Sequence, residues 1–103
     1  MPENQPMTEA TYYVLLAILK PGHGYRLMQR VRELSGGRLL MGPGTLYGIL
    51  SRMNKEGLII LSAEDGRRKC YEITETGKQA LITEYARLKR MVSDGAVLEE
   101  DME

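Results

Sequence analysis

The sequence contains no tryptophan and no phenylalanine, and it has one cysteine and one histidine among its 103 residues. One cysteine excludes an internal disulfide framework and favours an intracellular protein. One cysteine and one histidine do not provide the four ligands of a structural zinc site, so we expect no metal and no other cofactor.

Long hydrophobic runs are also missing. The longest strictly apolar run covers 12–19, which is too short for a membrane span of about 20 residues. The first ten residues include acids and no basic stretch, so we expect no secretory signal and no membrane partner. The sequence therefore favours a cytoplasmic protein.

Patterns typical of enzymes are absent as well. The sequence has no identifiable Ser-His-Asp or Cys-His set, no P-loop of the kind that binds phosphates and no cluster of metal ligands. Hydrophobic residues make up 43% and charged residues 27%, a composition typical of one small globular domain. Because so short a chain buries a modest core, association of two copies would bury more apolar surface. We therefore expect a non-enzymatic domain.

The zero net charge conceals a basic middle and acidic ends. All 14 lysines and arginines lie within 20–90 together with seven acids, so this window carries a charge of +7. The remaining seven acids lie in the flanks. A basic centre favours an anionic partner such as nucleic acid, although solvated charged surfaces are also common.

Two helices are predicted first. Thr8 is a good N-cap for a largely apolar helix that Pro21 and Gly22 bring to an end. A second helix begins near Gly24 and stops at the Ser-Gly-Gly sequence of 35–37. Its apolar residues are predicted to share one stripe: Tyr25, Leu27, Met28, Val31 and Leu34.

A third helix is predicted over 43–56. Pro43 suits the first turn, where its missing N–H costs nothing, and Gly57 is typical of a C-terminal cap. The apolar residues repeat at helical spacing on one face. The opposite face is polar and consists of Tyr47, Ser51, Arg52, Asn54 and Lys55.

A hairpin and a long helix follow. Two β-rich stretches flank the Asp65-Gly66 pair, which favours a hairpin turn with a basic tip at 64–69. Beyond Thr74, helical spacing returns with apolar residues about 3.5 positions apart, as in a short coiled coil. A bend near Gly95 is compatible with this pattern, and 96–103 can continue the helix or form an acidic tail.

The order of helix, helix, helix, β-hairpin and long helix predicts a mainly α fold with a β-hairpin, namely a winged helix-turn-helix with a C-terminal dimerisation helix. We expect a flexible lead over 1–7, the winged domain over 8–74, and the dimerisation helix with its acidic tail over 75–103. In such a fold the third helix enters the major groove of DNA and the hairpin contacts the neighbouring backbone or minor groove.

Three stretches of the sequence carry a family resemblance, and they begin at His23, Gly42 and Asp65. The most specific part is PGTLY at 43–47 with EGLI at 56–59, and YEITETG at 71–77 supports it. Together the three stretches resemble the PadR family of bacterial transcriptional regulators. The resemblance covers about 11–92. The family often has a proline after the motif tyrosine, where this chain has Gly48, which affects local helix geometry only.

The resemblance is to the compact branch of the family, whose C-terminal part is a single helix. It implies a homodimer in which the last helix swaps against the partner subunit. It also implies a possible effector near the dimer interface, of an identity that the sequence does not give.

Candidate DNA-contacting residues combine a glycine-rich helix start, hydroxyl groups and cations. They are Gly42, Pro43, Gly44, Thr45, Tyr47, Ser51, Arg52, Lys55, Arg67, Arg68 and Lys69. For several of them a plainer interpretation stays open. Tyr47 can be an ordinary half-buried aromatic residue, Arg52 and Lys55 a solvated face, and the basic tip a device that keeps a sheet edge soluble.

Candidate dimer contacts are the apolar residues of the last helix, although these can also pack on their own domain. They are Leu81, Tyr85, Leu88 and Val92. Together these features predict a homodimeric, sequence-specific repressor that reads an inverted repeat and is released by a small effector. The alternative is a winged-helix module for protein–protein contacts, without specific DNA binding.

Overall fold

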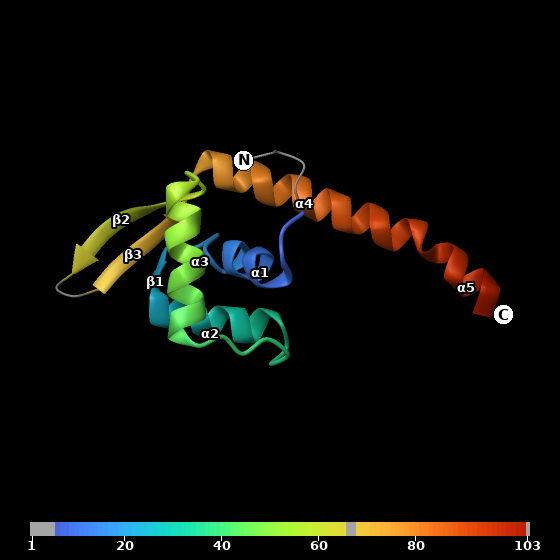
Figure 1. Cartoon of the computed structure of the whole chain (residues 1–103), viewed down its shortest axis with the longest axis horizontal. Helices are drawn as coiled ribbons and strands as arrows, with labels where there is room; N and C mark the ends of the chain where they lie inside the picture. Colours follow the sequence, from blue (N-terminus) through green and yellow to red (C-terminus); the bar gives the residue numbers. More distant parts are fainter. Residues whose placement is uncertain (1–5, 66–67, 103) are drawn as a thin grey trace.

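The computed structural model describes residues 6–65 and 68–102, with the backbone alone for 63–65. Three helices and a short strand precede a hairpin, and two helices follow it (Figure 1). In chain order the elements are α1 (Glu9–Ala17), β1 (Gly22–His23), α2 (Gly24–Leu34), α3 (Pro43–Lys55), β2 (Ile59–Asp65), β3 (Arg68–Ile73), α4 (Glu75–Asp94) and α5 (Ala96–Met102). The predicted winged-helix plan is confirmed, with β1 as an unpredicted addition.

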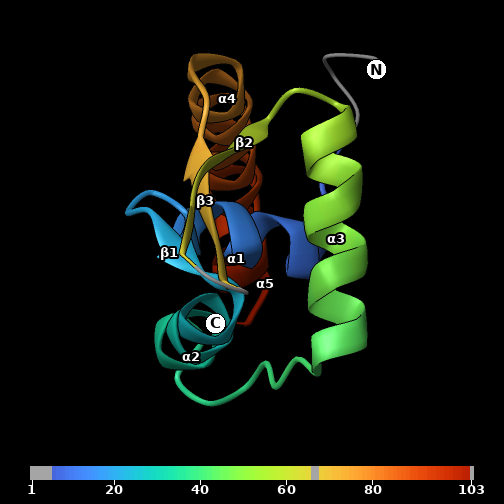
Figure 2. The ribbon, with the colours of Figure 1, turned by 90° about the vertical axis from the view of Figure 1, so that its left-hand side faces the viewer.

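The molecule is elongated, with principal extents of 58 × 29 × 20 Å. The hairpin of β2 and β3 projects at one end beside α3, while α4 crosses the body and carries α5 to the opposite end (Figure 1). Figure 2 looks onto the first end, where α3 stands upright beside the strands and α2 lies below. The fold thus places α3 and the hairpin at one end of the molecule and α5 at the opposite end.

The sheet has three antiparallel strands in the order β1-β3-β2, where the sequence predicted two. Gly22 pairs with Tyr71 and His23 with Cys70. The Nδ1–H of His23 also donates to the carbonyl oxygen of Lys69 at 3.2 Å. A two-residue strand has no sequence signal of its own, because its pairing depends on residues far along the chain.

The hairpin contains one irregularity. Leu61 pairs with Tyr71 and Ala63 with Cys70, so Ser62 is an extra residue on β2. Its hydroxyl donates to the carbonyl oxygen of Cys70 at 3.3 Å. Such a bulge increases the local twist of a hairpin. The connection at 66–67, and with it the predicted DNA contact Arg67, lies outside the described residues.

The core lies where α1, α2, α3 and the sheet meet. Its largest fully buried side chains include Leu15, Leu27, Leu46, Leu50 and Ile59. Burial of one such side chain contributes about 1.5–3 kcal/mol. The stripe predicted for α2 is wrong at its ends, since Tyr25 and Leu34 are 70% and 52% exposed. The core contacts only the narrower face of α2 that carries Leu27 and Val31.

The string YEITETG at 71–77 acts as a joint between the sheet and α4. The Thr74 hydroxyl accepts a hydrogen bond from the N–H of Gly77 at 3.0 Å and donates to the Gly57 carbonyl at 2.7 Å. A Cβ atom at Gly77 would overlap the carbonyl oxygen of Leu58. Glycine at this position therefore allows α4 to start directly against the beginning of β2.

Local signals set the ends of α3 and α4. Pro43 stands in the first turn of α3, and Gly57, just beyond it, has the positive φ of 77° that favours glycine. α4 ends at Asp94 with Gly95 as its C-cap, and the chain then resumes a helix in α5. Of the two alternatives for the last residues, the structure has the helical one over 96–102.

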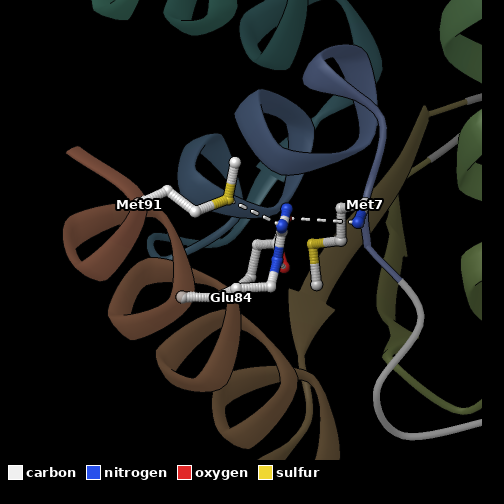
Figure 3. A network of polar contacts seen from close by, with 4 residues as sticks. Met7, Glu84 and Met91 are labelled. Atoms are coloured by element: carbon white, nitrogen blue, oxygen red, sulfur yellow. Dashed lines mark hydrogen bonds and ion pairs between the residues drawn. The ribbon is translucent and has the colours of Figure 1, made fainter. Parts of the chain in front are cut away.

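Glu84 on α4 is a buried acid that sequence reasoning missed (Figure 3). It is only 5% exposed and accepts hydrogen bonds from Arg87 at 2.6 and 2.8 Å and from the N–H of Met7 at 3.2 Å. Arg87 also contacts the Sδ atom of Met91 at 3.0 Å. The hydrogen bonds from Arg87 hold the pKa of Glu84 below its ordinary value, against the opposing effect of burial. The predicted lead at 1–7 therefore ends at a residue anchored to α4.

Candidate DNA-binding surface

α3 has the two faces that its sequence predicts. Leu46, Ile49, Leu50 and Met53 are buried in the core. The predicted contact residues of this helix are all exposed, namely Gly42, Pro43, Gly44, Thr45, Tyr47, Ser51, Arg52 and Lys55. A polar helix face therefore points away from the core and toward solvent.

The start of α3 is open. Gly42 is the N-cap and makes no side-chain capping bond, and a Cβ atom at Gly42 or Gly44 would meet nothing within 4 Å. The first N–H groups of a helix have no partner within the helix and carry partial positive charge. A partner can therefore approach the backbone closely at this point.

The structure brings Tyr47 together with the hairpin. Tyr47, Arg68 and Lys69 all line one cavity of about 460 Å³. Tyr47 reaches it from α3, and the two cations reach it from β3 (Figure 2 shows these elements). Ser51 and Lys55 lie farther along α3 and do not line this cavity.

Arg52 is partly engaged within the fold. Its Nη2 atom donates to the hydroxyl of Thr11 on α1 at 2.8 Å. A guanidinium has five N–H donors, so this bond leaves others for a second partner. Arg52 thus connects α3 to α1 while it stays on the exposed face.

The hairpin tip carries acids as well as cations. The strand register places Asp65 opposite Arg68 and Glu64 opposite Lys69. Over 64–69 the sequence has three cations and two acids, so the net charge of the tip is smaller than the run of cations alone suggests. Arg68 and Lys69 are exposed.

Sequence reasoning missed other residues that line the cavity, including His23, Arg26 and Tyr71. Tyr71 is mostly buried, and burial together with the nearby Tyr47 raises the pKa of Tyr71 above its ordinary value of 10.0. Its hydroxyl therefore stays protonated near neutral pH. No local pattern marks these residues, since the cavity depends on β1 and on the position of α2 beside β3.

The four predicted dimer contacts fall into two groups. Leu81 packs in the core of its own chain, which is the alternative interpretation of this helix. Tyr85 and Val92 are exposed and Leu88 is half-buried. These three residues line a shallow apolar hollow of about 400 Å³ together with Tyr12 from α1.

Metal ligands are not clustered among the side chains that the structure describes. Within 6–62 and 68–102, no three His, Cys, Asp or Glu side chains are grouped as a metal site would require. No helix in the same part of the chain is long and apolar enough to cross a membrane.

Comparison with known proteins decides the family. Residues 14–83 match the transcriptional regulator PadR-like family. The chain belongs to this family. The resemblance predicted from the strings at 43–47, 56–59 and 71–77 is thereby confirmed, and family and fold are those of transcriptional regulators rather than enzymes.

Two curated proteins are similar to this chain over most of its length or about two thirds of it. A 37.1 kDa protein in transposon Tn4556 of Streptomyces fradiae is 36% identical over 96 residues, which cover 89% of this chain and 27% of that protein. Transcriptional regulator YqjI of Escherichia coli is 34% identical over 70 residues, which cover 66% of this chain and 34% of that protein. The chain therefore spans only about a quarter to a third of the length of these curated relatives.

A solved structure confirms the winged-helix fold. The PadR-like transcription factor from Bacteroides fragilis superposes with a TM-score of 0.73 at 26% identity. The match covers 86% of this chain and 88% of that chain.

Proposed function

We propose that this chain is a sequence-specific DNA-binding repressor that acts as a homodimer. The observation that carries the proposal is the exposed polar face of α3 beside a hairpin that bears Arg68 and Lys69, at the end of the molecule opposite α5. Membership of the PadR-like family supports it.

α3 is the element proposed to enter the major groove, which is about 12 Å wide and admits one helix. Its glycine-rich start allows close approach to a phosphate. Thr45 and Tyr47 offer hydroxyls near that start, and Ser51, Arg52 and Lys55 extend the contacts along the helix. Hydroxyls and arginine can contact base edges, whereas most of the other contacts serve the backbone.

The hairpin tip at 64–69 is proposed to lie along the adjacent backbone or minor groove. Arg67, Arg68 and Lys69 supply its positive charge. Contacts of cations with phosphates release counterions, so they contribute affinity for any sequence and make it depend on salt. On this assignment the tip contributes affinity, and α3 contributes selectivity.

Two copies are proposed to associate through the far end of the molecule. Tyr85 and Val92 on α4 and Val97, Leu98 and Met102 on α5 are exposed apolar side chains. A second copy would cover such residues, and a two-fold axis would then present two α3 helices. Half-sites about 34–36 Å apart, or a multiple of this spacing, would suit such a dimer.

A small apolar effector between the two copies is part of the proposal. The hollow formed by Tyr12, Tyr85, Leu88 and Val92 offers it an apolar wall. Binding there would release DNA by changing the distance between the two α3 helices. The proposed place of action is the cytoplasm, on the operator DNA.

The test is selection of chromosomal fragments by the purified protein at moderate salt, followed by sequencing. We expect enriched fragments that share an inverted repeat. Failure to enrich any sequence would overturn specific DNA binding and favour a winged-helix module for protein contacts. A direct repeat or an isolated half-site would contradict the two-fold arrangement.

A further inference from the structure

The cavity between α2, α3 and the hairpin has a lining suited to an oxyanion. Its volume is about 460 Å³. The described residues that line it include three cations, three tyrosines and no acid. Arg26 comes from α2, Tyr47 from α3, and Arg68, Lys69 and Tyr71 from β3.

Tyr71 contributes a hydroxyl to the cavity. The residue is only 8% exposed and lines the cavity wall. No buried side-chain oxygen among the described residues lacks a hydrogen-bond partner, so this hydroxyl is not a buried orphan. A tyrosine hydroxyl donates one hydrogen bond, and an oxygen of a ligand in the cavity would accept it.

Tyr47 brings a second hydroxyl to the same place. A Cβ atom at Gly24 would overlap this hydroxyl, so glycine lets Tyr47 lie directly against the first turn of α2. At that helix start, His23 is the N-cap but makes no side-chain capping bond, and the first turn has no acid. The N–H groups there therefore have no side-chain acceptor from the cap, and they favour a negative charge.

The walls of the cavity are held in position. The hydrogen bond from His23 to the carbonyl of Lys69 ties the start of α2 to β3. The pairing of Gly22 with Tyr71 fixes the same two segments one residue farther along. Because its walls are already held in place, such a cavity loses little conformational freedom when a ligand binds.

We propose that this cavity binds one phosphodiester group of the DNA backbone, with its non-bridging oxygens accepting from Tyr71 and Tyr47. The proposal rests on the proposed function, because Tyr47, Arg68 and Lys69 also belong to the α3–hairpin surface. The role of this phosphate contact is to fix the position of α3 on the duplex, since contacts to phosphate set the register of a protein on DNA without reading its sequence.

The test is DNA binding by Tyr71→Phe, which removes one oxygen and keeps the ring. Fluorescence anisotropy is measured with a selected operator and with an unrelated duplex. We expect about tenfold weaker binding to both, because one hydrogen bond to a charged group is lost. Tyr13→Phe is the control, since the Tyr13 hydroxyl pairs with Arg38 and does not line the cavity.

Gly24→Ala provides an independent variant, because its Cβ atom displaces the Tyr47 hydroxyl while the Tyr71 hydroxyl stays. We expect the same parallel loss for both duplexes, and thermal unfolding verifies that each variant is folded. If the wild type binds DNA and folded Tyr71→Phe binds equally well, the phosphate site is wrong and the proposed function stands. A loss of affinity confined to the operator would also overturn the phosphate site. A wild type that binds no DNA would overturn the proposed function itself.

Discussion

Arg52 donates a hydrogen bond to the hydroxyl of Thr11 across the gap between α3 and α1. The N–H and side chain of Thr11 are themselves held by the N-cap residue Thr8. A residue on the exposed face of the proposed reading helix is thus connected to the first turn of the fold. Its contribution to stability and its contribution to DNA binding need to be separated.

The contributions of Arg52 to stability and to DNA binding can be separated with the variants Arg52→Ala and Thr11→Val. Each variant should lower the free energy of unfolding by about 1 kcal/mol, and the double variant should lose less than the sum. Chemical denaturation measures these values. In DNA binding Arg52→Ala should weaken affinity and Thr11→Val should not. Equal losses would mean that Arg52 acts through the packing of α1 and α3.

Gly77 and Gly48 both lie in helices and should respond oppositely to alanine. A Cβ atom at Gly77 overlaps the Leu58 carbonyl, so Gly77→Ala should destabilise by about 1–3 kcal/mol. Gly48 has open space around it, so Gly48→Ala should stabilise by about 1 kcal/mol through helix propensity. Thermal unfolding distinguishes the two, and equal responses would contradict the proposed close contact at Gly77.

Leu88→Asp should convert the proposed dimer to monomers, because a charge would then be buried in the interface. Light scattering at several protein concentrations gives the mass. Thr83→Asp is the matched control, since Thr83 is exposed and lies on the opposite side of α4 by helical spacing. A dimer that persists in folded Leu88→Asp would exclude this face of α4 as the interface.

Glu84 should make stability depend on acid pH. Its folded pKa lies below the ordinary value of 4.5, so its contribution is present above that value and is lost as the pH falls through the folded pKa. The melting temperature of Glu84→Gln should therefore lie below that of the wild type near neutral pH, and the difference should close in acid. Glu72→Gln, which replaces an exposed acid, should show no difference in melting temperature from the wild type that disappears in acid. A gap that stays constant with pH would contradict this role of Glu84.

Features set by neighbouring residues could be predicted from the sequence. The cap at Thr8, the start at Pro43, the stop at Gly57 and the cap of α4 at Thr74 each depend on side chains within a few positions. The amphipathic pattern of α3 likewise placed its apolar side in the core. These signals were enough for the order of α1, α2, α3, the hairpin and α4, and for the exposed face of α3.

Features set by distant residues could not be predicted. β1 exists because Gly22 and His23 meet β3, and no strand pattern marks a Gly-His pair. The same holds for the bond from Arg52 to Thr11 and for the burial of Glu84 beside Met7. Leu81 follows the spacing of the predicted seam, yet it is buried in the core of its own chain. Periodicity identifies an apolar face but not what covers each residue on it.

The most direct test of the central claim is the affinity of the protein for an operator duplex over a series of salt concentrations. If α3 and the hairpin bind the phosphate backbone, the logarithm of affinity should fall linearly with that of salt, by roughly 0.9 per phosphate neutralised. Replacing Arg67 and Arg68 together by alanine should lower this slope and weaken binding to every sequence. A wild-type affinity that does not change with salt, or no binding at low salt, would contradict the account.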